Sequence, residues 1–322
     1  MHMSRTTNTG RRPGWHWSEY WQSGRTEIMT IGTEGGEIVF DPGASWRAFF
    51  GSFDAGARLI DLATGGGQVA RLAHEVGAAT DKGFDVVGVD YADLGPSGGD
   101  VAPGLRLIGG VALERLPFDD ASFDGAASQF GIEYADTRLA LGELARVLKS
   151  GGRARLLVHS TESAVSQSTA AQSAAHDRVM PDDALIQKAR RAFNAHMRRS
   201  PRDVLSAQEQ ALREAVQKAA AKIVDDAAYD PVRYHLDYLA DLARGVARYE
   251  PRSALARLDV FEAGVAAWRQ RHRSQMKAAL DRPGLDAFLD RAVRKGLRPL
   301  ESGGETDARG ALVAWRVDLI RD

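Results

Sequence analysis

Short apolar runs that alternate with helical segments, from residue 57 onward, constrain this chain more than any other feature. Each run is apolar nearly throughout, which is typical of a strand buried on both faces. Between the runs, residues 68–77 and 136–152 carry apolar side chains at helical spacing and then reach a glycine. Such alternation predicts right-handed βαβ crossovers and a mainly parallel sheet. The expected strands are 57–63, 85–90, 105–110, 122–130 and 153–159.

The alternation stops at residue 160 and resumes near residue 285. Between these points the chain shows apolar stripes at helical spacing only, with prolines near the expected helix starts. A helix at 285–296 and two strands at 297–302 and 311–320 follow, and a glycine-rich turn predicts that these strands form an antiparallel hairpin. We therefore expect a seven-stranded, mainly parallel sheet with a large helical insertion before its last elements.

Four regions follow from these boundaries. Residues 1–13 are polar and basic and are expected to be a disordered tail, whereas residues 14–56 are rich in aromatic side chains and are expected to form a helical lid. Residues 57–160 together with 281–322 form the expected α/β domain. The inserted residues 161–280 are expected to be a helical cap over an enclosed pocket or a dimerisation subdomain.

A glycine-rich turn, from Asp61 to Gly67, lies between the first expected strand and the first helix. Small residues there let the backbone approach a ligand closely, and the following helix offers unpaired N–H groups. The second strand ends at Asp90, which is placed to accept hydrogen bonds from ribose hydroxyls. A carboxylate at Asp61 would repel a pyrophosphate but suits a ligand with an ammonium group. These features argue against a dinucleotide site.

Four segments in this order resemble the class I S-adenosylmethionine-dependent methyltransferases: LIDLATGGG, VVGVD, LPFDDASFDGAASQFGI and ELARVLKSGGRARLLV. The chain is particularly similar to the branch that contains the ubiquinone and menaquinone C-methyltransferases and many small-molecule methyltransferases. The resemblance covers residues 57–160 well and 285–320 loosely, and it does not cover 160–280. It implies a Rossmann-like, doubly wound α/β fold, S-adenosylmethionine as the cofactor and S-adenosylhomocysteine as its product.

The resemblance also implies a role for individual residues. The glycine turn would hold the methionine part of the cofactor, with Ala63 at the position of the usual first glycine. Asp90 would hold the ribose hydroxyls, and Tyr91 would lie against the adenine. Ala112 stands where the family usually has an acid, so backbone groups of Ala112 and Leu113 are expected to read the adenine edge. The full expected cofactor set is Asp61, Ala63, Gly65, Gly67, Asp90, Tyr91, Ala112, Leu113 and Gln129.

Two residues are candidates for proton transfer at the methyl acceptor. His159 ends the fifth strand, at the carboxyl edge where α/β sites lie, and is the best candidate for a base. Glu133 follows the fourth strand, where an acid at a helix start is the alternative interpretation. Tyr20, Trp21 and Phe130 are expected to contact the acceptor or to form a lid, and core packing is the alternative for the two N-terminal rings.

Composition excludes several other kinds of site. The chain has no cysteine, which rules out disulfides and thiolate ligands, and its histidines do not match the spacing of an HExxH pair, so no metal is expected. No apolar run approaches the roughly 20 residues of a membrane-spanning helix, and a cytoplasmic protein is expected. Residues 181–280 hold 18 Lys and Arg against 13 Asp and Glu, a surplus of 5 that is small for a nucleic-acid-binding module.

Three functions stay open at this point. The first is methyl transfer to a small molecule by in-line displacement, which depends mainly on positioning. The second is methylation of a peptide or protein held by the helical insertion. The third is a cofactor-binding pseudoenzyme or interaction protein, which the missing acid at Ala112 favours and the intact Asp61 and Asp90 oppose. A homodimer formed through the insertion is compatible with each of them.

Overall fold

The computed structural model describes residues 14–22, 30–33, 36–39 and 42–322, so the expected tail at 1–13 lies outside the described residues. The chain divides into two compact units, and each is discontinuous in sequence. The α/β unit takes its residues from Met1–Met29, Val39–Ser163 and Lys277–Asp322, and the helical unit takes its residues from Thr30–Ile38 and Ala164–Met276.

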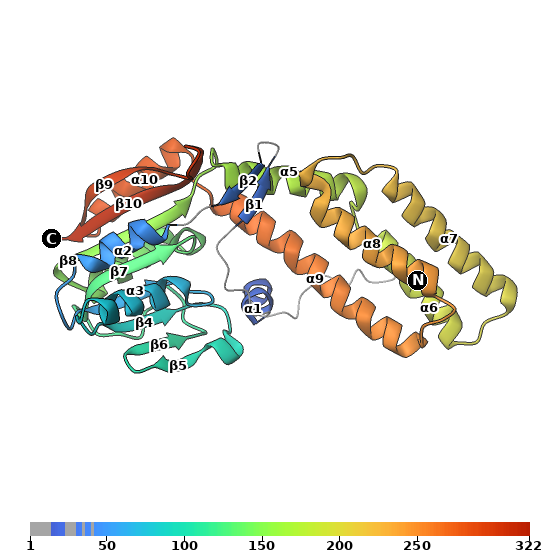
Figure 1. The fold of residues 1–322 in the computed structure, drawn as a ribbon, viewed down its shortest axis with the longest axis horizontal. Helices are drawn as coiled ribbons and strands as arrows, with labels where there is room; N and C mark the ends of the chain where they lie inside the picture. The colour runs from blue at the N-terminus through green and yellow to red at the C-terminus, as the bar shows by residue number, and fades with distance from the viewer. Residues whose placement is uncertain (1–13, 23–29, 34–35, 40–41) are drawn as a thin grey trace. The chain divides into compact units, whose positions relative to one another are not determined.

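An eight-stranded sheet forms the centre of the α/β unit, with the strand order β5-β6-β4-β3-β7-β8-β10-β9 (Figure 1). Its parallel part consists of β3 (Arg58–Leu62), β4 (Asp85–Val89), β6 (Leu105–Ile108), β7 (Phe123–Gln129) and β8 (Leu148–His159). The hairpin of β9 (Leu297–Thr306) and β10 (Leu312–Arg321) pairs antiparallel with β8. The mainly parallel sheet and the antiparallel C-terminal hairpin are therefore confirmed.

Three details differ from the sequence-based expectation. The sheet has eight strands rather than seven, because β5 (Gly99–Ala102) pairs antiparallel with the edge strand β6. The glycines Gly151 and Gly152 lie within β8 and do not end a helix, since α4 (Thr137–Val147) already ends before them. Residues 14–56 are not only helical: besides α1 (Trp15–Gln22) and α2 (Gly43–Gly51), they contain two short strands.

Helices cover both faces of the sheet. On one face α2 lies beside α3 (Gln68–Ala79), as Figure 1 shows. On the other face α4 packs against α10 (Arg282–Val293), and their apolar side chains join Ile60 and Leu62 of β3 in one core cluster. Because successive strand residues point to opposite faces, the intervening residue Asp61 points toward α3. This alternation aims a carboxylate at the start of that helix.

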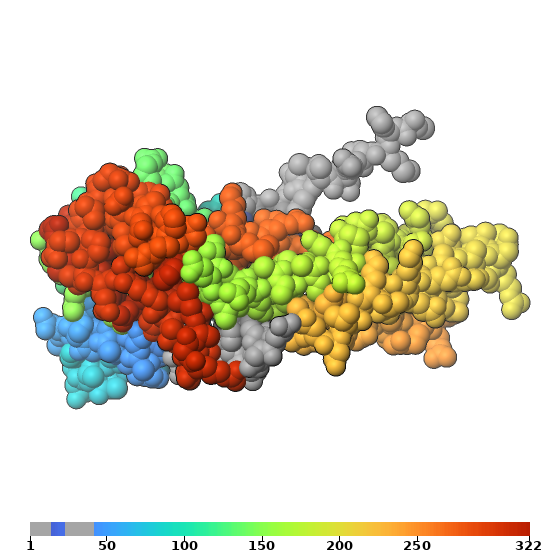
Figure 2. Space-filling model, turned by 90° about the horizontal axis from the view of Figure 1, so that it is seen from above, coloured from blue at the N-terminus to red at the C-terminus, as the bar shows by residue number. Residues whose placement is uncertain are grey.

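The helical unit has its own apolar core. Its elements are α5 (Ala164–Val179), α6 (Ala184–Met197), η3 (Ala227–Tyr229), α7 (Arg202–Ala220), α8 (Asp230–Gly245), α9 (Pro251–Ala278) and the two-stranded sheet of β1 (Thr30–Thr33) and β2 (Gly36–Val39). Phe193, Leu212, Leu239 and Leu258 are fully buried in this core. In the view of Figure 2, α5, α7 and α8 form much of this unit's surface, coloured from lime to amber. No helix among the described residues is both long and apolar enough to cross a membrane.

Candidate functional site

The buried carboxylate of Asp61 holds the glycine turn between β3 and α3 through hydrogen bonds. Its Oδ2 atom accepts a hydrogen bond from the Thr64 hydroxyl at 2.5 Å and another from the backbone N–H of Ala70 at 3.1 Å. The Asp61 side chain is buried, and this burial, with a smaller contribution from the charge of Asp90, raises the pKa of Asp61 to about 7. Asp61 thus ties the turn to the first turn of α3, and its contact with a ligand ammonium group stays a prediction.

Left-handed backbone shapes the same turn. Ala63, Gly65 and Gly67 have φ values of 57°, 53° and 81°, in the region that favours glycine. Ala63 carries a Cβ in spite of this conformation, and it lies close to the end of β7, because a Cβ added at Gly131 would be 2.3 Å from the Ala63 Cβ. The turn therefore accepts alanine at the position of the family's first glycine only with backbone strain.

Asp90 binds the glycine turn from the end of β4. Its Oδ2 atom accepts a hydrogen bond from the backbone N–H of Gly65 at 2.8 Å, and its Oδ1 atom accepts one from Ala92 at 2.7 Å. Burial raises the pKa of Asp90, and these two hydrogen bonds oppose that increase. Each carboxylate oxygen can accept a second hydrogen bond. The carboxylate can therefore fix Gly65 and still receive two hydroxyl groups of a ligand.

The other expected cofactor residues are less directly engaged with the turn. The amide oxygen of Gln129 accepts a hydrogen bond from the indole N–H of Trp46 in α2, at 2.7 Å. The carbonyl of Ala112 closes a backbone turn with the N–H three residues later, and the Leu113 side chain is buried. Tyr91 is half exposed. The structure thus gathers the glycines and the two aspartates, and the cofactor role of every residue in this set stays a prediction.

Helix α1 lies directly on the glycine turn. A Cβ added at Gly65 would be 2.4 Å from the indole ring of Trp21, so only glycine leaves room for that ring. Ser18 Oγ accepts a hydrogen bond from the backbone N–H of Asp93 at 3.0 Å, and the amide of Gln22 donates to the Asp93 carbonyl at 3.2 Å. These contacts place Trp21 over the turn, as a lid would be.

Rings of α1 continue from this turn toward the end of β8. Trp17 stacks on Trp21 with ring centroids 6.5 Å apart, and Tyr20 lies edge-on to Trp21 at 4.8 Å. Trp17 also meets the ring of Tyr134 at 5.4 Å, in an edge-to-face arrangement. Tyr134 in turn lies edge-on to the imidazole of His159, at 5.8 Å. A continuous aromatic surface therefore connects the glycine turn with the candidate base.

Glu133 and His159 form a buried pair at the carboxyl ends of β7 and β8. Glu133 lies in the single turn η2 (Ile132–Tyr134), and its Oε1 atom accepts a hydrogen bond from the His159 backbone N–H at 3.0 Å. The same oxygen lies 2.7 Å from Nδ1 of the His159 ring, and the side chains of Glu133 and His159 are 0% and 4% exposed. A carboxylate in this position fixes the ring's orientation and its tautomer.

Two residues beside this pair show how tightly it is enclosed. The Phe130 ring lies 4.3 Å from the His159 ring and tilted by 36°, and Phe130 has the unusual φ of 54° for a residue with a side chain. Burial, with the charge of Glu133, raises the pKa of Tyr134 well above its usual value. Strain at a bulky residue next to a buried, hydrogen-bonded pair of polar side chains is typical of a functional site.

The sequence pattern indicated Glu133 and His159 separately, without a sign that they form a pair. The two residues are 26 positions apart, and only the parallel register of β7 and β8 brings their strand ends together. Thr64 and Trp17 were missed as site residues. The i, i+4 spacing of Trp17 and Trp21 would have placed both rings on one helix face, and Thr64 follows Asp61 at a spacing typical of turn hydroxyls.

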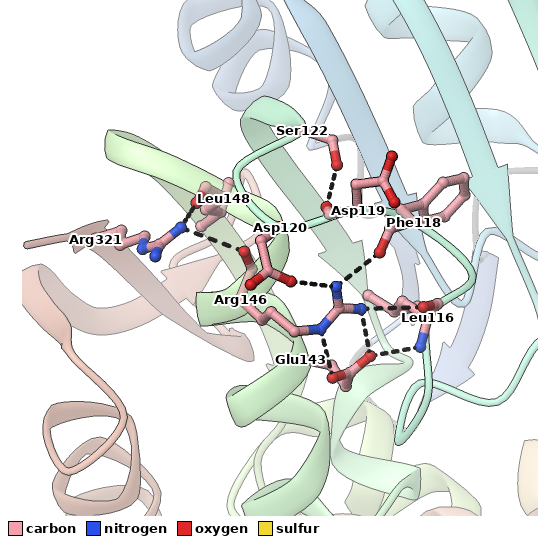
Figure 3. A network of polar contacts seen from close by, with 9 residues as sticks. All are labelled: Leu116, Phe118, Asp119, Asp120, Ser122, Glu143, Arg146, Leu148 and Arg321. Carbon is pink, nitrogen blue, oxygen red and sulfur yellow. Dashed lines mark hydrogen bonds and ion pairs between the residues drawn. The ribbon is translucent and has the colours of Figure 1, made fainter.

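The segments LPFDDASFD and RVLKSGG hold each other in place through one arginine. Figure 3 shows the guanidinium of Arg146, the first residue of RVLKSGG, facing the LPFDDASFD segment. It binds the Glu143 carboxylate with two atoms at 2.8 Å and the Asp120 carboxylate at 2.8 Å. It also donates to the backbone carbonyls of Phe118 at 2.7 Å and Leu116 at 3.0 Å. Arg146 thus fixes the loop before β7 onto α4, away from the glycine turn.

Comparisons with known proteins agree with this geometry. A family model described as "Methyltransferase domain" matches residues 60–156, which contain the glycine turn, Asp90 and Glu133. The chain is 37% identical over 134 residues to the ubiquinone/menaquinone biosynthesis C-methyltransferase UbiE of Geotalea uraniireducens, a match that covers 38% of this chain and 56% of that protein. The UbiE of Geobacter sulfurreducens is 37% identical over 113 residues, which cover 33% of this chain and 43% of that protein.

A solved structure of an S-adenosylmethionine-dependent methyltransferase from Mesorhizobium loti is also similar. It is 26% identical, and the match covers 36% of this chain and 53% of that chain with a TM-score of 0.30. The chain spans about half the length of the curated relatives that it matches. The family model shows that residues 60–156 form a methyltransferase domain, and residues 164–276 of the helical unit lie outside the stretch that this model matches.

Proposed function

We propose, from the methyltransferase domain in residues 60–156, that this chain transfers a methyl group from S-adenosylmethionine to a small-molecule acceptor. One observation carries the proposal. The Asp90 carboxylate binds the N–H of Gly65, so the residue expected to hold a ribose is fixed against the turn expected to hold the amino-acid part of the cofactor. Both lie at the carboxyl edge of the sheet, where α/β proteins bind ligands.

The residues at this edge fit the cofactor. Asp90 keeps acceptor capacity for two ribose hydroxyls, and the first N–H groups of α3 suit the carboxylate of an amino acid. The Trp21 ring at Gly65 is the immediate neighbour of any ligand there, so α1 would contact the cofactor or move aside to admit it. A bound S-adenosylmethionine supplies a methyl group on a positively charged sulfur, which the faces of aromatic rings attract.

Within this proposal, the chain's own residues have three tasks. Asp90 and the glycine turn orient the donor, and α1 excludes water through Trp17, Tyr20 and Trp21. His159, held by Glu133, accepts a proton when the acceptor must lose one. Alignment of the two reactants supplies most of the rate increase, because in-line displacement depends mainly on proximity and orientation.

Calorimetric titration with S-adenosylmethionine and S-adenosylhomocysteine tests the proposal. We expect wild type to bind both, and Asp90→Ala to weaken binding by about 100-fold or more, since it removes two charge-assisted hydrogen bonds to the ligand. Asp85→Ala is the matched control: it removes a carboxylate from the opposite end of the same strand, where Asp85 pairs with Arg58 on the surface. Circular dichroism verifies that each variant is folded.

If folded wild type bound neither compound, the proposed function would be wrong. Binding without turnover of any acceptor would instead favour the pseudoenzyme. A cytoplasmic location and a homodimer formed through residues 161–280 are parts of the same proposal, and light scattering measures the second. Binding of peptides to the helical unit would instead favour the alternative of a peptide or protein acceptor.

A further inference from the structure

Charged residues of the helical unit are divided between its two ends. The segments around the α6–α7 and α8–α9 connections, residues 197–204 and 244–252, contain six arginines and two acids. The segments around the α5–α6 connection and around η3, residues 180–183 and 221–230, contain five aspartates and one lysine. The small surplus of cations over residues 181–280 therefore conceals a strong local excess of positive charge.

The two arginine-rich segments lie at the same end of the helical unit, as Figure 1 shows for the connections α6–α7 and α8–α9. Helices α6 and α9 are antiparallel, because Arg269 pairs with Asp183 just before α6 and Arg190 pairs with Asp259 farther along it. The end of α6 and the start of α9 each lie about two helical turns beyond that second pair. We call residues 197–204 and 244–252 together the basic end.

Most of the positive charge at the basic end is free to bind an outside anion. All six arginines are exposed, and Arg244 alone of them forms an ion pair among the described residues, with Asp241 at 3.6 Å. The other five are Arg198, Arg199, Arg202, Arg248 and Arg252. Of the two acids, Asp203 lies in the first turn of α7, and Glu250 accepts hydrogen bonds from the first N–H groups of α9.

Arg199 occupies a backbone position that favours glycine, with a φ of 53°. Its N–H donates to the His196 carbonyl at 3.0 Å, and the N–H of Ser200 donates to the Ala195 carbonyl at 3.0 Å, so α6 ends in a hydrogen-bonded turn. Pro201 then leads directly into α7. A long charged side chain at a strained position is typical of a functional surface, and the short connection holds its backbone in place.

Two apolar side chains lie beside these arginines. Met197 is 43% exposed at the end of α6, and Val204 is 39% exposed in the first turn of α7. In the interface of a bilayer, such side chains enter the region between headgroups and acyl chains, while guanidinium groups bind the lipid phosphates. A nucleic acid would bind the same arginines through its phosphates, but exposed aliphatic groups would add nothing to that binding. The combination therefore favours a lipid surface.

We propose that the basic end docks this protein on a bilayer that contains anionic lipids. The arginines bind headgroup phosphates, and Met197 and Val204 enter the headgroup region. The same negative surface repels the aspartates at the other end of the helical unit, so the division of charge also orients the unit on the bilayer. The inference goes beyond the proposed function and does not depend on it, because it uses no residue of the α/β unit.

Sedimentation with vesicles tests the inference. Full-length wild type is mixed with vesicles of phosphatidylcholine alone, or of equal parts phosphatidylcholine and phosphatidylglycerol. We expect binding to the anionic vesicles only, and a decrease in that binding as NaCl screens the exposed charges. The variant Arg198→Gln/Arg199→Gln/Arg202→Gln is expected to lower the partition coefficient by about 100-fold, since each cation near the surface contributes about fivefold.

The matched control removes the same charge elsewhere. The variant Arg106→Gln/Arg115→Gln/Arg294→Gln changes three exposed arginines of the α/β unit and is expected to bind anionic vesicles as wild type does. Circular dichroism verifies that both triple variants are folded. Equal binding to neutral and anionic vesicles, or equal weakening by the two triple variants, would show that the basic end is not a docking surface.

A second pair of measurements separates a bilayer from a nucleic acid. The variant Met197→Gln/Val204→Gln keeps every charge and is expected to weaken vesicle binding by about tenfold, because it removes the apolar contribution. Duplex DNA is the competing probe, and we expect wild type to bind it more weakly than anionic vesicles. Tighter binding of DNA, with no effect of Met197→Gln/Val204→Gln on the vesicles, would overturn the inference in favour of a nucleic acid.

Discussion

One histidine of the α/β unit, His159, and one cluster of histidines in the helical unit differ in their surroundings. In the α/β unit, His159 has a buried carboxylate 2.7 Å from its ring. In the helical unit, His176, His235 and His272 lie 4.8, 5.9 and 3.9 Å from the ring of Trp268, and no carboxylate of the described residues is hydrogen-bonded to them. The first arrangement orients a ring through a carboxylate, whereas in the second burial favours the neutral form of the rings.

The electrostatics of the helical cluster follow from this difference. Burial, reinforced by the positive charge of Arg269 nearby, lowers the pKa of His176 to about 3 and that of His235 to about 4. Burial, with the charge of Arg271, lowers the pKa of His272 to about 4. Both ring nitrogens of His176 and Nδ1 of His235 have no hydrogen-bond partner among the described residues. An imidazole that is buried without a carboxylate partner therefore contributes through packing. It lowers the stability of the folded state when the pH falls, because the unfolded chain binds a proton more readily.

The largest expected effect is selective loss of the helical unit in mild acid. These three histidines have a pKa near 6.5 in the unfolded chain and lower pKa values in the folded protein. Stability is therefore fully present above pH 6.5 and decreases as the pH falls toward 4. We expect a loss of at most about 2 kcal/mol for each histidine between pH 7.5 and pH 5. Hydrogen exchange of the amides in α5, α8 and α9 over this range measures the effect.

The variant His176→Phe sharpens that measurement. Phenylalanine keeps a flat ring in the cluster but cannot bind a proton. The loss of stability between pH 7.5 and pH 5 should therefore become smaller by the contribution of one histidine, at most about 2 kcal/mol. Amides of β3 and β4 in the α/β unit are the internal reference and are expected to change less. Equal loss of protection in both units, or no effect of the substitution, would contradict the comparison.

The next effect concerns a buried ion pair of the α/β unit. Arg155 of β8 binds Asp318 of β10 with two hydrogen bonds of 2.7 and 2.8 Å, and both side chains are 12% exposed. Replacing Asp318 by Ala would leave the Arg155 charge buried and unpaired, so we expect a loss of about 3 kcal/mol in the free energy of unfolding. Chemical denaturation measures this loss.

The double variant Arg155→Met/Asp318→Leu is the control for that prediction. It removes both charges and keeps similar volumes, so it should be more stable than Asp318→Ala alone. If the single and double variants lost the same free energy, the cost would come from packing at β8 and β10 rather than from an unpaired charge. The contrast between paired charges in one unit and unpaired imidazoles in the other would then be weaker.

The smallest expected effect is a gain in stability at the glycine turn. Ala63 in the α/β unit and Arg199 in the helical unit both have left-handed backbone, with φ values of 57° and 53°. Glycine relieves the strain at either position but has more freedom in the unfolded chain, so we expect each substitution to stabilise by about 0.5–1 kcal/mol. Thermal denaturation of Ala63→Gly and Arg199→Gly measures both.

Only the substitution at the site should also affect ligand binding. Ala63→Gly is expected to change the affinity for S-adenosylhomocysteine, because the turn holds Gly65 against Asp90, whereas Arg199→Gly is expected to leave it unchanged. Destabilisation by Ala63→Gly would mean that the alanine methyl contributes more by packing than its backbone conformation costs.

The sequence by itself determined the elements that repeat a local pattern. Continuous apolar runs and helical spacing predicted the parallel strands, the crossover helices and the C-terminal hairpin, because burial on both faces of a sheet leaves a direct signature. The strand β5 (GDVA) was missed, since its pairing with β6 depends on a neighbouring edge rather than on its own residues. The glycine turn and Asp90 were found for the same local reason: both are ends of recognisable strands.

Tertiary structure alone decided which of these residues meet. The register of β7 and β8 pairs Glu133 with His159, the placement of α1 sets Trp21 against Gly65, and the turn geometry directs Asp61 to Thr64 and Ala70. Packing of α5, α8 and α9 likewise gathers three histidines around Trp268 without an acid. Sequence patterns record whether a residue is buried, but the partner of a buried polar group depends on contacts between distant segments, which leave no periodic trace.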